Sequence, residues 1–336
     1  MAESIGQKII AEKAGVSRTT VSVVLNNRPT PVISEKTRRR VLKVAQSMGY
    51  RPRPKINFPT GTHNIGIFVG RGPLGVFANP FYAQVFDGIQ QEAAQNGFHL
   101  IFAMPENRTG RTGPALITEH KCDGALIVGP VRERILEAIR ADQIPAVAIG
   151  DAPADIEAVV ADNPRAARLA VEYLYSHGHR HIAYLGADRT NLVASDRYDA
   201  FRLAMFDHGI DLNRDWILDI AGDADSGELA VDKLAEKLDG LTAVLCCNDA
   251  TAFGVIARLR LLGKRVPEDI SIVGMDDVPS ARRANLTTIS VPKEDMGRLA
   301  VKKLLGKIAG DDTPPNRSVV PVALVERGSV APRVAS

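Results

Sequence analysis

The sequence predicts an α/β protein in which a small three-helix head precedes a body of two doubly wound parallel-sheet subdomains. From residue 64 onward, short apolar runs alternate with amphipathic segments, which is typical of parallel strands joined by helices. Before residue 64, apolar residues recur only at helical spacing. Charge divides the chain at the same place, because residues 1–63 hold 12 Lys or Arg and 3 Asp or Glu, whereas the remainder holds 30 and 36.

The length and composition of the chain exclude several classes of protein. The 336 residues leave room for two or three domains, and the longest apolar run stays well short of the ~20 residues of a transmembrane helix. The start of the chain lacks the apolar core of a signal peptide, so we expect a cytoplasmic protein with no membrane partner. Cys122, Cys246 and Cys247 are interpreted as reduced, buried side chains and not as a disulfide or a metal site.

The first two expected helices of the head form a helix-turn-helix. Gly15 lies where a left-handed residue is needed between them, and Ser17 can cap the second helix. In such a unit the N-terminal residues of the second helix contact base edges in the DNA major groove. Two amphipathic helices of an ordinary bundle are the alternative interpretation. The apolar residues at helical spacing are Ile5, Ile9 and Ile10 in the first helix and Val21, Val24 and Leu25 in the second.

A third helix is predicted from Ser34 to Met48, capped by Ser34 and ended by Gly49. Its apolar face closes a small core, while its basic side chains stay outside. A basic head on an acidic body is the pattern expected for binding a phosphate backbone. A solvated basic tail is the alternative, but it would lack the apolar periodicity. The apolar face holds Val41, Val44, Ala45 and Met48, and the basic side chains are Arg38, Arg39, Arg40 and Lys43.

The body is predicted to contain eleven strands, enough for two doubly wound subdomains with a ligand crevice at the carboxyl ends of the strands. The expected strands are 65–69, 99–104, 125–128, 146–149, 158–161, 181–185, 216–220, 243–246, 270–274, 288–291 and 319–325. The expected helices include 81–96, 165–177, 195–208 and 250–262.

Two features suggest enzymes or metal sites, but neither has supporting context. Gly70–Gly75 matches the spacing of a dinucleotide-binding loop, yet Pro73 intervenes and the helix is expected to begin at Asn79-Pro80. In the segment His177–His181, alternation along a strand sends the histidines to different faces. We find no Walker loop, Gly-x-Ser-x-Gly elbow or supported carboxylate pair, so we expect no catalytic residue, no cofactor and no metal.

Specific motifs in the head resemble the lactose-repressor (LacI/GalR-type) family of bacterial transcription regulators. They are Ala14-Gly15-Val16-Ser17, Thr20-Val21-Ser22, Val24-Leu25-Asn26, Lys36-Thr37-Arg38 and Gly49-Tyr50-Arg51-Pro52. The body is similar to the effector domain of that family, itself like periplasmic binding proteins. The matching segments are 79–82, 122–124, 178–183, 247–249, 266–277 and 286–288, so the resemblance covers roughly residues 5–332.

The resemblance implies three parts. Residues 1–50 form the helix-turn-helix DNA-binding domain, 51–63 a Pro-rich linker, and 64–332 an effector-binding and dimerisation domain of two subdomains. The chain should cross between these subdomains near Asp162, Val291 and Val325. The linker lacks the Ala-Arg-x-Leu stretch with which relatives wedge the minor groove, so we expect it to stay extended.

The DNA-binding residues implied by the motifs begin at the second helix. Arg18 and Thr19 should contact base edges, and Val23 a thymine methyl group. Ser17, Ser22 and Asn26 should hold phosphates. The full set is Ser17, Arg18, Thr19, Thr20, Ser22, Val23, Asn26, Thr37 and Tyr50.

The effector-binding residues follow from the fold and the family together. Arg197 offers a fork of donors, and nearby acids and an amide supply acceptors, a set that suits the vicinal hydroxyls of a sugar. For Asp276 and Asp249, capping of a strand end is the alternative role. The expected set is Asn79, Phe81, Tyr82, Asp151, Arg197, Asn248 and Asp276. Ala224, Val291 and Lys293 occupy places where some relatives carry aromatic or amide contacts.

The resemblance therefore implies a sequence-specific DNA-binding transcriptional regulator, a repressor, whose operator affinity is controlled by a small molecule. The expected effector is a carbohydrate, either a sugar or a sugar derivative, bound between the subdomains. A homodimer should bind a pseudo-palindromic operator. A sugar-binding module without a DNA role and a nucleotide-dependent enzyme are the alternatives.

Overall fold

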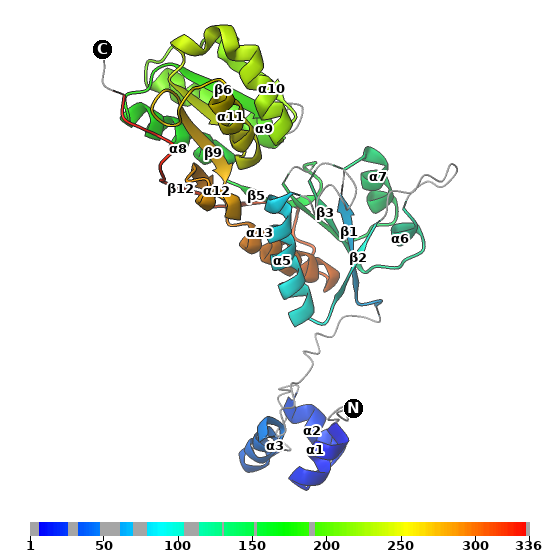
Figure 1. Cartoon of the computed structure of the whole chain (residues 1–336). Coiled ribbons are helices and arrows are strands. Elements are labelled where there is room, and N and C mark those ends of the chain that lie inside the picture. Colours follow the sequence, from blue (N-terminus) through cyan, green and yellow to red (C-terminus); the bar gives the residue numbers. More distant parts are fainter. Residues whose placement is uncertain are drawn as a thin grey trace. The chain divides into compact units, whose positions relative to one another are not determined.

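The computed structural model describes residues 7–25, 33–47, 61–69, 79–103, 114–129, 131–150, 153–187 and 192–333. The helical head and the α/β body form two separate compact units (Figure 1). Of the expected linker, only residues 61–63 belong to the described residues. In the described ranges, no helix is both long enough and apolar enough to cross a bilayer.

The head is built from three helices, α1 (Gln7–Ala14), α2 (Arg18–Leu25) and α3 (Glu35–Ser47). Gly15 has a φ of 61°, which confirms the predicted left-handed turn between α1 and α2. The predicted cap of α2 is also confirmed, since Ser17 Oγ accepts the Thr20 N–H at 3.0 Å. The buried core of the head consists of Ile10, Ala11, Ala14, Val21, Val24, Val41 and Ala45. The expected core residues Ile5 and Met48, and the side chain of Leu25, lie outside the described structure.

The first subdomain of the body holds a six-stranded, fully parallel sheet in the order β11-β5-β4-β3-β1-β2. Its strands are β1 (Asn64–Val69), β2 (His99–Phe102), β3 (Gly124–Val128), β4 (Ala146–Ile149), β5 (Glu157–Ala161) and β11 (Arg317–Val320). Its helices are α5 (Pro80–Gln95), α6 (Ala115–Thr118), α7 (Glu133–Ala141) and α13 (Lys293–Ile308).

The second subdomain repeats this plan in the order β12-β10-β9-β8-β6-β7, with β12 alone antiparallel to its neighbour. Its strands are β6 (Ile182–Ala187), β7 (Ile217–Ile220), β8 (Ala243–Cys246), β9 (Ser271–Asp276), β10 (Thr287–Ser290) and β12 (Ala323–Val325). Its helices are α8 (Asn163–Ser176), α9 (Leu192–Asp207), α10 (Ala224–Leu234), α11 (Asp249–Leu261) and α12 (Pro279–Arg283), with 3₁₀ turns η1 (Arg214–Trp216) and η2 (Ala235–Gly240).

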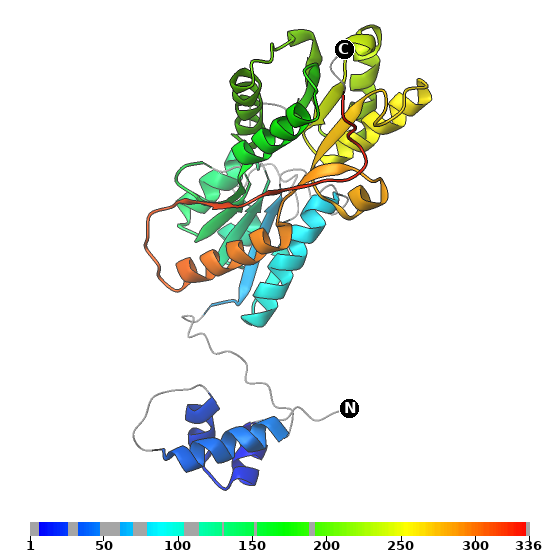
Figure 2. The same cartoon turned by 90° about the vertical axis from the view of Figure 1, so that its left-hand side faces the viewer.

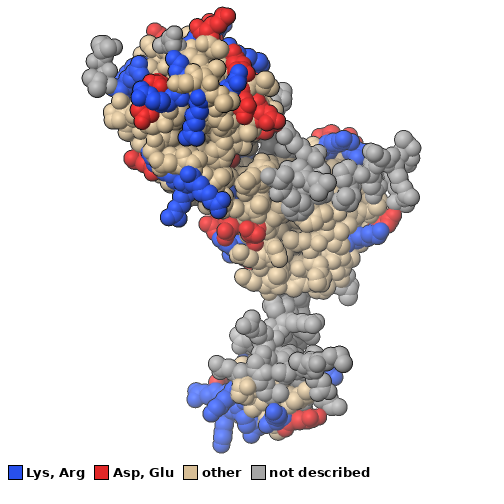
Figure 3. Space-filling model, viewed as in Figure 1, with Lys and Arg blue, Asp and Glu red and all other residues tan. Residues whose placement is uncertain are grey.

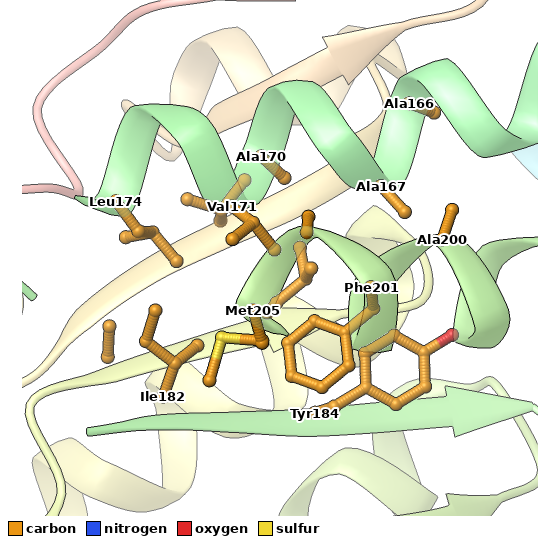
Figure 4. Close-up of a cluster of buried hydrophobic side chains, with 14 of the residues drawn as sticks. Ala166, Ala167, Ala170, Val171, Leu174, Ile182, Tyr184, Ala200, Phe201 and Met205 are labelled. Carbon is orange, nitrogen blue, oxygen red and sulfur yellow. The ribbon is translucent and has the colours of Figure 1, made fainter. Parts of the chain in front are cut away.

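The core on one face of the second sheet shows why α8 and α9 lie close together. Small residues of α8, Ala167 and Ala170 among them, face the large side chains Phe201 and Met205 of α9 (Figure 4). Phe201 stacks on Tyr184 of β6 with ring centroids 4.7 Å apart. A separate buried cluster fills the opposite face beneath α10 and α11. Helices on both faces of two parallel sheets confirm the predicted fold class.

The chain passes between the two subdomains at three places. The first crossover follows β5 at Asp162, and the second follows β10 at Val291, both as predicted. The third was expected near Val325 and is wrong by a few residues, because the segment 319–325 is not a single strand. Pro321 cannot continue the ladder, so the chain leaves the first sheet after β11 and enters the second as β12 (Figure 2).

Each sheet reverses its strand order at one point, and this point positions the crevice. In the first sheet the reversal lies between β1 and β3, and in the second between β6 and β8. The carboxyl ends of the strands on either side of such a point bind ligands in open α/β sheets. In the second subdomain a site is therefore expected after β6 and β8, and the end of β9, which lies next to β8, belongs to the same edge.

Candidate functional site

Arg197 is held in place by two hydrogen bonds at the carboxyl edge of the second sheet. Its Nε donates to Asn163 Oδ1 at 2.8 Å, and its Nη1 donates to the backbone oxygen of Cys247 at 2.6 Å. Nη2 makes no hydrogen bond to any residue within the described ranges. The guanidinium is thus fixed in orientation by α8 and the end of β8 while one face of donors stays available.

Asp276 ends β9 close to this guanidinium and has an exposed fraction of 9%. Burial raises the pKa of its carboxyl to about 7, and Asp249 adds to the rise, although the nearby Arg197 and Lys293 oppose it. The carboxylate accepts no hydrogen bond from the described residues. Asp276 therefore supplies an acceptor that a ligand can use, next to the donors of Arg197.

Lys293 is buried beside Asp276 but directs its protons elsewhere. Its Nζ donates to the backbone oxygens of Asp276, of Asp277 at 3.2 Å and of Val291 at 3.1 Å. An ammonium has three N–H donors, so these bonds use all of them. Burial lowers the pKa of Lys293, whereas the neighbouring carboxylates raise it. Lys293 contributes positive charge to the site without offering it a hydrogen-bond donor.

Asn248 and Asp249 stand at the start of α11, directly after β8. Asn248 caps the helix, since its Oδ1 accepts the Thr251 N–H at 2.8 Å, and its Nδ2 donates to the Gly222 oxygen at 2.7 Å. One amide hydrogen of Asn248 remains for a ligand. Asp249 is fully buried and accepts bonds from the Val278 N–H at 2.9 Å and Thr288 Oγ1 at 2.6 Å. Both carboxylate oxygens of Asp249 are thus used within the protein, in the capping role that the sequence analysis gave as the alternative.

The structure brings together three of the seven expected effector residues, Arg197, Asn248 and Asp276. Asn79, Phe81 and Tyr82 lie instead at the start of α5, beyond the carboxyl end of β1 in the first subdomain. Asn79 Oδ1 accepts the Phe81 N–H at 2.9 Å, and the rings of Phe81 and Tyr82 meet edge to face at 5.2 Å. Asp151 lies outside the described residues.

Asn163 was missed from the sequence, and Lys293 was named only as a place where some relatives carry aromatic or amide contacts, without the role that the structure gives it. Asn163 could not be recognised from the sequence because its hydrogen-bond partner, Arg197, lies far along the chain. Lys293 stands at the first position of α13, where a cation is unfavourable because it opposes the helix dipole. That unfavourable placement was the sign in the sequence that Lys293 has a specific role. The suspected histidine motif has a structural role: buried His179 bonds Thr242 Oγ1 at 3.1 Å and the Ala331 oxygen at 3.0 Å. The loop Gly70–Gly75 lies outside the described residues.

The head presents a second candidate surface. Arg18 and Thr19 are exposed at the start of α2, while Thr20 and Val23 are partly exposed. Ser34 caps α3, since its Oγ accepts the Thr37 N–H at 3.2 Å, in the same way that Ser17 caps α2 through Thr20. Figure 3 shows basic side chains gathered over α3, and the exposed ones are Lys36, Arg39, Arg40 and Lys43. Among the expected DNA contacts, Asn26, Tyr50 and the side chain of Ser22 lie outside the description.

Comparison with known proteins matches both parts of the chain. The model of bacterial regulatory proteins of the lacI family matches residues 8–53, and that of a periplasmic binding protein-like domain matches 171–330. The HTH-type transcriptional repressor PurR of Vibrio vulnificus (strain CMCP6) is 33% identical over 317 residues, which cover 90% of this chain and 91% of the repressor.

Solved structures agree with these matches. The complex of transcriptional regulator CelR with cellobiose has a TM-score of 0.72 and 27% identity, covering 97% of this chain and 100% of that one. The lac repressor dimer bound to operator and the anti-inducer ONPF has a TM-score of 0.69 and 26% identity, covering 98% and 100%. Since the relatives are transcriptional regulators and not enzymes, the chain belongs to the lacI family of bacterial DNA-binding transcriptional regulators.

Proposed function

We propose that this regulator binds a neutral sugar or sugar derivative between its subdomains and, as a homodimer in the cytoplasm, a pseudo-palindromic operator. The proposed parts are a DNA-binding head over residues 1–50, a linker over 51–63 and an effector-binding and dimerisation body over 64–332. The similarity to the lac repressor dimer on its operator supports the homodimer, and the similarity to the CelR–cellobiose complex supports the class of effector.

The observation that carries the effector class is the pairing of a fixed guanidinium with a buried carboxylate. An anionic ligand placed against Arg197 would face Asp276, and a cationic ligand placed against Asp276 would face Arg197. A hydroxyl group avoids both conflicts, because it accepts from the guanidinium and donates to the carboxylate. Asn248 adds one further donor. Asn79, Phe81, Tyr82 and Asp151 are proposed to contact the same ligand from the first subdomain.

The proposed DNA contacts divide by chemistry. Arg18 and Thr19, exposed at the start of α2, read base edges, and partly exposed Val23 contacts a thymine methyl. Ser17, Ser22 and Asn26 are proposed to hold phosphates, with Thr20, Thr37 and Tyr50 beside them.

A thermal-shift screen of the full chain tests the effector class. The panel contains neutral sugars, including cellobiose and ribose, together with sugar phosphates and nucleosides. A ligand at 100 times its Kd stabilises the folded state by about 2.7 kcal/mol, so a binding sugar should raise the melting temperature by several degrees. Asp276→Asn should abolish that rise, and Asp312→Asn, in an exposed segment, should leave it unchanged. Stabilisation by phosphorylated compounds alone would contradict a neutral effector.

A further inference from the structure

The guanidinium of Arg197 is bonded to the first crossover between the subdomains. Asn163, which accepts from Arg197 Nε at 2.8 Å, has an exposed fraction of 2% and directly follows Asp162. The Asp162 N–H donates to the oxygen of Val320 at 3.0 Å, at the end of β11 in the first sheet. A shift of Arg197 is therefore transmitted through one buried side chain to a segment that is attached to the other subdomain.

The turn that carries Asp276 is bonded to the second crossover in the same way. Lys293 donates to the oxygens of Asp276 and Asp277 in this turn and to that of Val291 in the crossover itself. Asp276 and Asp277 have φ values of 114° and 54°, a left-handed region that residues with a Cβ rarely adopt. Such a turn is held by bonds from outside, and Lys293 supplies two of them.

Lys293 also moves with the first subdomain, because it is the first residue of α13. This helix packs on β3, β4 and β5. Its Gly297 lies so close to α5 that an added Cβ would overlap the backbone oxygen of Val85, and an added Cβ on Gly88 would overlap the oxygen of Glu294. Two helices whose backbones touch at glycines shift as one body. Lys293 therefore belongs to the first subdomain through α13 but bonds the turn that follows β9 in the second subdomain.

We propose that Asn163 and Lys293 are positioning residues that couple the effector site to the crossover segments, so that a change at Arg197 or Asp276 shifts the geometry between the subdomains. The inference rests on the proposed function only in that Arg197 and Asp276 contact the effector. Neither residue needs to touch the ligand. Asn163 transmits from Arg197 to the first crossover, and Lys293 transmits from the turn at Asp276 to the second.

A simpler role for Lys293 would be to balance the charge of Asp276 and Asp249. The two roles differ in what they require. Charge balance requires only a cation nearby, which Lys293→Arg retains. Coupling requires three bonds from one nitrogen to three backbone oxygens, a geometry that a planar guanidinium does not reproduce. If Lys293 couples the two parts, Lys293→Arg should behave like Lys293→Met. If Lys293 only balances charge, Lys293→Arg should behave like the wild type.

Hydrogen–deuterium exchange of the full chain, measured by mass spectrometry without ligand, tests the coupling. Asp276→Asn stands in for a ligand by changing the site, and the readout is amide exchange in peptides covering residues 290–294. In the wild-type background we expect exchange there to change by about three- to tenfold, the scale of a local opening. In the Lys293→Met and Lys293→Arg backgrounds, Asp276→Asn should leave those amides unchanged. Lys302→Met, on the exposed face of α13, is the matched control and should preserve the response.

Arg197→Lys provides the parallel experiment at the first crossover. It should alter exchange in peptides covering residues 160–165 in the wild type and not in Asn163→Ala. An equal response with and without Asn163 or Lys293 would overturn the proposal, as would a wild-type-like response in Lys293→Arg. If Lys293→Met does not fold, Lys293→Gln carries the same expectation. Because no sugar is used, failure of the sugar screen would refute the effector class and leave this result standing.

Discussion

Arg18 is the residue on which sequence recognition by the head is expected to depend. It lies exposed at the N-terminus of α2, the end of a recognition helix that meets base edges. Arg18→Ala should cost ~1–3 kcal/mol on the operator and little on random DNA, measured by fluorescence anisotropy on a sequence selected in vitro. Lys36→Ala is the control, because an exposed lysine on the basic face of α3 is expected to contact phosphate and its loss should weaken binding to both DNAs alike. Equal losses for Arg18→Ala on both DNAs would show that it contacts only phosphate.

Asp276 should make the stability of the body fall as the pH rises. Its pKa is raised from 3.8 to about 7, so between pH 4 and pH 7 the folded protein binds a proton that the unfolded chain has released. The free energy of unfolding therefore declines across this window and levels off above it. Urea unfolding at pH values from 4.5 to 8 measures this decline in the free energy of unfolding. Asp276→Asn should make the decline smaller, and the part that remains comes from Asp249, whose pKa is about 6.

Asp269 provides a comparison of opposite sign. Its hydrogen bonds from Arg265 lower its pKa to about 2, so its contribution is present above pH 4 and is lost as the pH falls toward 2. Asp269→Asn should leave the profile between pH 4.5 and 8 unchanged. A decline that survives in Asp276→Asn at full size would mean that Asp276 does not titrate in this window.

The residues of the effector site divide into those a sequence can identify and those it cannot. Asn248 and Asp276 stand at a helix start and a strand end, places that alternating apolar runs mark, and Arg197 lies in the second turn of α9, near the start that the sequence predicts for this helix. Asn163 and Lys293 act through partners brought close only by the tertiary structure, and Lys293 bonds backbone oxygens that any residue type would present. The left-handed turn at Asp276 and Asp277 could not be predicted, because neither position is a glycine.

At the scale of elements, the two subdomains share a device that the apolar pattern did not reveal. In each, one pair of helices packs backbone to backbone at glycines, α5 with α13 and α10 with α11. Periodicity indicates which face of a helix is buried but not how closely a neighbour approaches it. The break between β11 and β12 is a different case, because Pro321 is visible in the sequence and should have divided the expected strand 319–325.

Gly254→Ala should be destabilising because its Cβ would overlap the backbone oxygen of Ala224 on α10. Overpacking of a tight contact costs about 1–3 kcal/mol, more than the helix gains from alanine. Gly306→Ala on α13 is the control, since its nearest atom would lie at 3.7 Å, and it should be neutral or slightly stabilising. Urea unfolding of both variants measures the difference. A Gly254→Ala protein as stable as the wild type would mean that α10 and α11 separate readily.

At the scale of the whole molecule, the head and the body are two units. In the proposed homodimer we expect the linker between them to decide how the two heads reach the operator. Three prolines in residues 51–63 disfavour a helix and favour an extended chain, for which we expect about 3.1 Å per residue. Thr62 and His63 are bonded to Asp123 of the body, so eleven residues, 51–61, are left to extend. They reach roughly 34 Å, close to the 34–36 Å of one DNA turn, and each of the two heads has such a tether. Two heads tethered in this way should tolerate a change in the spacing of their half-sites, provided that both half-sites stay on one face of the DNA.

The spacing of the half-sites therefore tests the dimer and the linker together. Inserting 5 base pairs between them turns one half-site to the opposite face, and affinity should fall toward that of an isolated half-site. Inserting about 10 base pairs restores the face, and an extended linker should recover most of the loss. A linker that folds into a fixed hinge helix would recover none of it, since the heads could not separate by a further turn. Gel-shift titrations on the three DNAs decide between these outcomes, and equal affinity for all three would mean that only one head binds at a time.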